Sequence, residues 1–155
     1  MFGRIDLEFL KQPQLTDWRF VGCYPGLHYT VYPQYAFRVP DSEETIRITR
    51  APKLHGDNGL RFWLSAEWAQ GWNGREQFMS SYVANAAFEV ISEAEFNTLV
   101  TAQSGELLVS RPLPLHSHQG FVGALVLYSM KTDFIVSLFA EYEDEFIHFY
   151  WDTTA

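Results

Sequence analysis

Apolar and polar residues alternate over several short segments of the chain, a pattern typical of strands with one buried face. In one of these segments Ile46 and Ile48 are predicted to point inward and Arg47 outward. Strands are predicted on these grounds over residues 5–9, 17–23, 35–39, 45–50, 60–68 and 88–91. The segments 35–39 and 45–50 flank an acidic turn, so they are expected to pair as a hairpin.

Two later runs, residues 121–128 and 134–140, contain no charged residue. Continuous apolar runs of this length indicate central strands that are covered on both faces. A third strand is expected over residues 146–151, and only short turns separate the three. The pattern therefore predicts an antiparallel meander in the last third of the chain.

Helical signals are fewer. Ser92 and Glu95 stand in the capping-box relation, and apolar residues then recur at i, i+3 and i+4, which predicts a helix over about 92–103 that ends at Gly105. Residues 75–87 show apolar positions four apart and are assigned as a second helix, although the flanking sequence fits an extended chain equally.

These elements together predict the α+β class, with a mostly antiparallel sheet and one or two helices. The 155 residues correspond to one domain, and no linker or repeat divides residues 1–155. A domain of this size buries about 68–70% of the surface of its unfolded chain, so it needs no disulfide or structural metal to fold.

Composition agrees with a packed core. The apolar fraction is 47%, with 13 Phe, 8 Tyr and 5 Trp. Cys23 is the only cysteine, so no intrachain disulfide can form, and a reducing compartment is expected. Residues 1–10 do not resemble a secretory signal, and the longest apolar stretch, 121–130, is shorter than the roughly 18 residues that a membrane span needs. A cytoplasmic protein is therefore expected, without contact to a membrane.

Charge is distributed unevenly along the chain. Residues 1–75 hold nine Lys and Arg against eight Asp and Glu, whereas residues 76–155 hold two against eleven, and the net charge is −8. An acidic half repels phosphate backbones and attracts basic surfaces. Nucleic acid is therefore excluded as a direct partner and a basic protein is favoured, while the alternative is that the charge serves solubility alone.

Few residues indicate catalysis or metal binding. His116 and His118 share one face if extended, but no third ligand lies near them in sequence, so no metal site is predicted. His148 lies among aromatic residues, which favours a buried, hydrogen-bonded histidine over a catalytic one. No histidine lies at a sequence offset from Cys23 that would indicate a nucleophilic Cys–His pair. Phosphate loops, dinucleotide turns, nucleophile elbows and zinc-helix motifs are absent from the sequence, so no cofactor is expected.

Two features suggest recognition of a partner protein. One is the acidic cluster in the segment 141–145, interpreted as a solvated turn that steers a basic partner. The other is a turn-rich aromatic stretch in which an exposed indole could anchor a partner, or fold back onto the core. The candidate partner-binding residues are Glu141, Glu143, Asp144, Glu145, Trp68 and Trp72.

Three hypotheses of function follow. The first is a non-catalytic protein-binding domain, and its size, acidity and lack of catalytic motifs are those expected of a bacterial immunity protein that blocks a toxin's cationic active site. This analogy rests on composition, since no motif identifies such a family. The second is a small-ligand-binding or hydrolytic domain with an aromatic-lined pocket that uses His148 or Cys23. The third is a structural subunit whose apolar strands complete a homodimer.

Overall fold

A six-stranded antiparallel sheet forms the centre of the protein in the computed structural model, which describes residues 1–3, 6, 24–69, 76–109, 120–128 and 134–154. The strand order is β1-β2-β6-β5-β4-β3, and all five pairings are antiparallel. The strands are β1 (His28–Tyr32), β2 (Glu44–Pro52), β3 (Ala87–Ile91), β4 (Phe121–Tyr128), β5 (Ile135–Tyr142) and β6 (Glu145–Thr153).

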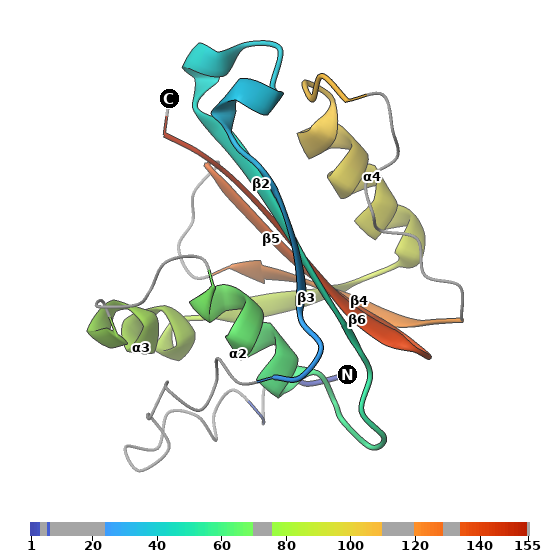
Figure 1. The fold of residues 1–155 in the computed structure, drawn as a ribbon. Helices are drawn as coiled ribbons and strands as arrows, with labels where there is room; N and C mark the ends of the chain where they lie inside the picture. The colour runs from blue at the N-terminus through green and yellow to red at the C-terminus, as the bar shows by residue number, and fades with distance from the viewer. Residues whose placement is uncertain (4–5, 7–23, 70–75, 110–119, 129–133, 155) are drawn as a thin grey trace.

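Helices cover both faces of this sheet (Figure 1). Helix α4 (Glu93–Ser104) lies on one face, and helices α2 (Leu60–Trp68) and α3 (Glu76–Ala84) lie on the other. Two short 3-10 turns, η3 (Gln34–Ala36) and η4 (Pro40–Ser42), connect β1 to β2. The protein therefore belongs to the α+β class and is mostly sheet.

The two faces carry two separate hydrophobic cores. On the α4 face, Phe96 and Val100 pack with Ile46, Ile48 and other buried residues of the strands. On the α2 face, a second core is largely aromatic and comprises Phe2, Tyr24, Ala51, Phe62, Trp63, Leu64, Val83, Leu125, Leu127, Phe139 and Phe146. Alternate residues of β4, β5 and β6 therefore serve different cores, which explains why these strands are apolar on both faces.

The pairing registers align residues into rows across the whole sheet. One such row, from edge to edge, is Val90, Leu125, Phe139, His148, Thr49 and Tyr29. Directly opposite residues in a ladder point to the same face. Leu125 and Phe139 belong to the core on the α2 face, so the whole row faces α2. His148 thus lies near the middle of the sheet beneath a helix, while Val90 and Tyr29 lie on the two edge strands.

Several expectations from the sequence are confirmed. The predicted helix over 92–103 is α4, with Ser92 as its N-cap, a complete capping box with Glu95 and Gly105 at its C-cap. The second predicted helix is α3. Strand β3 leads directly into α4, and β4, β5 and β6 form the predicted meander. The expected strands over 5–9 and 17–23 lie outside the described residues, Asp6 excepted.

The predicted hairpin between residues 35–39 and 45–50 is wrong. Strand β2 forms where expected, but its neighbours are β1 and β6. Residues 34–36 form η3 instead, and η4 begins at Pro40. Prolines at positions 33 and 40 remove backbone donors on both sides of this segment, which leaves room for a single bridge, from Phe37 to Leu107.

The predicted strand over residues 60–68 is also wrong, because this segment is α2. Six consecutive residues of α2, from Phe62 to Glu67, are buried. A short, mostly apolar segment fits a buried strand and a buried helix equally, so periodicity could not separate them. The turn before it starts the helix: Asp57 and Asn58 side chains accept hydrogen bonds from the backbone N–H groups of Gly59 and Leu60, at 2.9 and 3.1 Å.

Gly59 provides a test of this helix start. Its φ is +89°, and a Cβ atom there would lie 2.4 Å from Cζ of Phe139. We expect Gly59→Ala to lower the free energy of unfolding by about 2–5 kcal/mol, since left-handed backbone costs about 1–2 and overpacking about 1–3 kcal/mol. Gly56→Ala is the matched control, because Gly56 also has a positive φ of +75° but nothing lies within 4 Å. Equal losses of unfolding free energy for the two variants in urea denaturation would contradict the close approach of Gly59 to Phe139.

Candidate functional site

A cluster of buried polar side chains lies between the sheet and helices α2 and α3. Glu67 extends from α2, His148 and Ser137 from β6 and β5, and Tyr82 from α3. Glu67 Oε1 lies 2.9 Å from His148 Nε2 and accepts hydrogen bonds from the hydroxyls of Ser137, at 2.8 Å, and Tyr82, at 3.3 Å. One carboxylate oxygen therefore connects two helices to the centre of the sheet through hydrogen bonds.

This arrangement of Ser137, His148 and Glu67 differs from a catalytic triad. A triad uses both ring nitrogens of the histidine, one toward the acid and the other toward the serine. Here Ser137 Oγ, at 3.2 Å, and Glu67 both contact Nε2. His148 has no exposed surface, and Ser137 and Glu67 are also buried. The prediction of a buried, hydrogen-bonded histidine is confirmed, and the geometry does not support a nucleophilic serine.

Several buried polar atoms in and beside the cluster have no hydrogen-bond partner among the described residues. These atoms are His148 Nδ1, Glu67 Oε2, Thr49 Oγ1 and Trp63 Nε1. Thr49 lies directly opposite His148 in the β2–β6 ladder, and Trp63 precedes Glu67 by one helical turn. Unpartnered buried polar groups cost about 1–3 kcal/mol each, so this layer is a costly part of the core.

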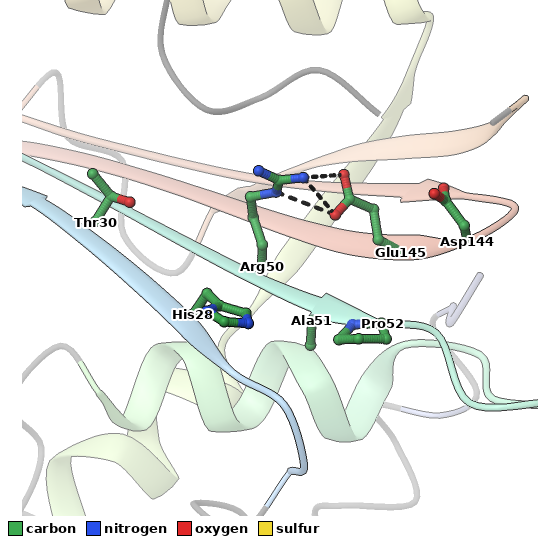
Figure 2. A pocket seen from close by; sticks show the side chains of 7 residues that line it. All are labelled: His28, Thr30, Arg50, Ala51, Pro52, Asp144 and Glu145. Carbon is green, nitrogen blue, oxygen red and sulfur yellow. Dashed lines mark hydrogen bonds and ion pairs between the residues drawn. The ribbon is translucent and has the colours of Figure 1, made fainter. Parts of the chain in front are cut away.

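An open pocket of about 550 Å³ lies at one end of the sheet, beside β1. It is lined by His28, Thr30, Arg50, Ala51, Pro52, Asp144 and Glu145 (Figure 2). Within it Arg50 donates to Glu145 from Nη2, at 2.9 and 2.8 Å to the two oxygens, and from Nε at 3.2 Å. Arg50 and Glu145 thus pair with each other within the pocket, and the edge strand β1 contributes His28 and Thr30 to its lining.

The pocket does not include His148, which lies beneath α2. The hydrolytic hypothesis expected an accessible histidine in a cavity, and the enclosure of His148 counts against that role. Cys23, the other residue named for it, lies outside the described residues, as do His116 and His118. Among the described side chains, no group of three or more His, Cys, Asp or Glu residues could hold a metal ion.

The predicted acidic turn divides into buried and exposed parts. Glu141 belongs to β5 and is only 1% exposed, so its interpretation as a solvated turn residue is wrong. Its oxygens lie 3.3 Å from the amino group of Met1 and 3.6 Å from Lys53 Nζ. Glu145 belongs to β6 and pairs with Arg50, whereas Glu143 and Asp144 form the exposed turn. The carboxylates that sequence reasoning grouped together therefore face different surroundings.

Tyr142 brings the β5–β6 turn close to the start of α4. The pKa of Tyr142 is raised to about 12, most of all by burial, then by the charge of Glu93 and a hydrogen bond to it, and least by the charge of Glu145. Glu93 is in the first turn of α4. Sequence reasoning did not identify this contact, because the two residues are far apart in the chain.

The predicted aromatic anchors are only partly described. Trp68 is the last residue of α2 and is half-buried against the aromatic core, which corresponds to the indole folded back toward the core. Trp72 lies outside the described residues. The two edge strands carry the exposed apolar side chains Tyr29 and Val31 on β1 and Val90 on β3, and Val122 of the inner strand β4 is also exposed.

Both edge strands have an unpaired side among the described residues. Strand β1 pairs only with β2, and β3 pairs only with β4. None of the other backbone hydrogen bonds found between described residues involves β1 or β3. Free backbone donors and acceptors on an edge are a template for another extended chain. These edges are where the sheet can bind a further strand.

Comparison of the chain with protein-family models, with curated proteins and with solved structures gives no significant match. None of the described helices has both the length and the apolar character of a membrane span.

The buried cluster makes a prediction about stability. We expect Glu67→Ala to lower the free energy of unfolding by about 3–5 kcal/mol in urea denaturation, because it removes one partner of a buried pair. The double variant Glu67→Leu with His148→Leu removes both partners, and we expect it to lose less than the single variant. A larger loss in the double variant would show that the pair itself, and not the orphaned histidine, carries the stability.

Tyr142 makes a prediction about alkaline pH. Its folded pKa of about 12 exceeds the ordinary value of 10.0, so its contribution to stability is fully present below about pH 10 and is lost as pH rises through about 12. We expect Glu93→Gln to lower the pKa of Tyr142, and Tyr142→Phe to reduce the loss of stability above pH 10. Ultraviolet titration of tyrosinate absorbance and urea denaturation at pH 9 and 11 measure these effects. An unchanged titration in the Glu93→Gln variant would contradict the contact.

Proposed function

We propose that the chain is a non-catalytic protein-binding domain that presents an acidic surface to a basic partner. The observation that carries this proposal is the charge around β3. Residues 76–109 include five Glu but no Lys, Arg or His. Glu89 of β3 and Glu93 and Glu95 of α4 are all exposed. A surface of one sign attracts a partner of the opposite sign and speeds the encounter.

The edge of β3 supplies a second, independent reason. Its outer side is free of strand pairing in the described part of the chain, and Val90 is 66% exposed in the middle of it. By register Val90 is on the α2 face and Glu89 on the α4 face. An extended segment added to such an edge gains main-chain hydrogen bonds, and its alternate side chains meet different surfaces.

This geometry defines the kind of segment that would fit. Opposite-charge pairs and apolar pairs directly across a ladder are each favourable, by about 0.2–1 kcal/mol. A basic side chain opposite Glu89 and an apolar one opposite Val90 satisfy both. The proposed partner therefore offers an extended segment in which basic and apolar residues alternate.

The finer proposal is an inhibitor of the immunity type, acting in the cytoplasm, which would cover a cationic active site with this acidic edge. Its support is the net charge of −8 together with the exposed acids of α4 and β3. Glu143 and Asp144 extend the acidic surface at the β5–β6 turn, where Tyr142 contacts Glu93. Glu141 contributes little to such a surface because it is buried.

A peptide of alternating Lys and Val residues provides the test. We expect fluorescence anisotropy to show binding that weakens as salt rises, and Glu89→Lys to raise the dissociation constant at least about tenfold, since like charges then face each other across the ladder. Equal binding of a peptide with the same residues in two blocks, all Lys followed by all Val, would contradict strand addition.

A matched control separates the edge from the net charge. Asp41→Lys changes the charge equally, at an exposed position in η4 that is not part of β3 or α4. Glu143→Lys tests the β5–β6 turn in the same way. We expect both variants to bind the alternating peptide more strongly than Glu89→Lys does. Equal losses of peptide affinity in all three variants would show that binding depends on net charge alone, and would overturn the β3 site.

A further inference from the structure

The edge of β1, at the other side of the sheet, has different chemistry. Its sequence is His-Tyr-Thr-Val-Tyr, without Lys, Arg, Asp, Glu or Pro. Tyr29 is 53% exposed and Val31 is 54% exposed, and both point to the α2 face. Native sheets usually protect an edge with charges, prolines or bulges, and the β1–β2 register runs without a bulge over all five residues.

This strand is complementary to itself. If a second copy pairs antiparallel about a twofold axis at Thr30, each Tyr29 faces Val31 of the other copy, and each His28 faces Tyr32. Aromatic and β-branched residues directly opposite each other are a favourable cross-strand pair. A twofold interface requires this kind of self-complementarity, because the same patch is used by both copies.

Antiparallel pairing of two copies through β3 about a twofold axis is unfavourable. Glu89 is the central residue of β3, so a twofold axis there would place Glu89 opposite Glu89. Like charges directly opposite each other destabilise a ladder. The two edges of the sheet therefore select different occupants: β3 disfavours a second copy, and β1 contains no charge that opposes one.

We propose that two copies of the chain associate through β1 and join their sheets into one continuous sheet. The pocket beside β1 adjoins this interface, because His28 and Thr30 of β1 line it. Tyr32 of the second copy would lie opposite His28 and cover the rim of the pocket. Five paired residues make a small interface, so the dimer is expected to be concentration-dependent.

Sedimentation velocity of the full chain over roughly 5–500 μM tests the proposal, a range suited to small interfaces. We expect a monomer–dimer equilibrium in the wild type. Thr30→Lys places two introduced lysines face to face, so its dissociation constant should rise at least about tenfold, and Thr30→Glu should behave alike. A wild type that stays monomeric throughout would overturn the proposal.

Mixing the two variants makes the test specific for the register. In an equimolar mixture of Thr30→Lys and Thr30→Glu, opposite charges face each other at the axis, so the dimer should return; failure to return would overturn the twofold pairing about Thr30. This rescue also shows that both variants are folded. Val90→Lys on β3 is the matched control and should dimerise like the wild type. A dimer lost in Val90→Lys but kept in Thr30→Lys would assign the interface to β3.

Discussion

Burial of both faces of one sheet is the constraint on which the rest of the structure depends. A strand buried on both sides must be apolar at consecutive positions, and β4, β5 and β6 meet this requirement with residues that alternate between the two cores. Such strands need helices on each face to exclude water. The connections of the chain supply them, with α2 and α3 before β3 and α4 between β3 and β4.

Covering both faces leaves the two edges as the places where the sheet can be extended. The edges differ because β1 comes from the nearly neutral half of the chain and β3 from the acidic half. In the described part of the chain, Arg47, Arg50 and Lys53 lie on or just after β2, next to β1, whereas Glu89, Glu93 and Glu95 lie on β3 and at the start of α4. This separation of charge across the sheet is the physical basis on which we propose a basic partner at one edge and a second copy at the other.

The polar cluster beneath α2 has a structural role in this arrangement. Glu67 connects α2, α3, β5 and β6 through hydrogen bonds at one oxygen, and His148 lies in the centre of the sheet. Removing one member of such a buried network costs stability, because it leaves the remaining members without partners. It also gives α2 a defined position on a core that is otherwise aromatic and non-directional.

Local patterns in the sequence were sufficient for much of the fold. The capping box of Ser92 and Glu95 determines where α4 begins, and the alternation in β2 follows from the two-residue repeat of a strand. Both can therefore be recognised from the local sequence alone. The burial of His148 was also predictable, because its neighbours in the strand are apolar.

Tertiary structure decided the rest, because the same residues satisfy more than one local geometry. The run Leu60–Trp68 is apolar enough for a buried strand, but in the folded chain it is a helix that covers the aromatic core on one face of the sheet. Glu141 looks like a turn residue until the pairing of β5 with β6 buries it beside Lys53. The identity of the edge strands depends on strand order alone, and strand order is a property of contacts between distant segments. The sequence by itself therefore determined the class and the acidic half of this protein, and only the folded chain decided which strands present their edges to a partner.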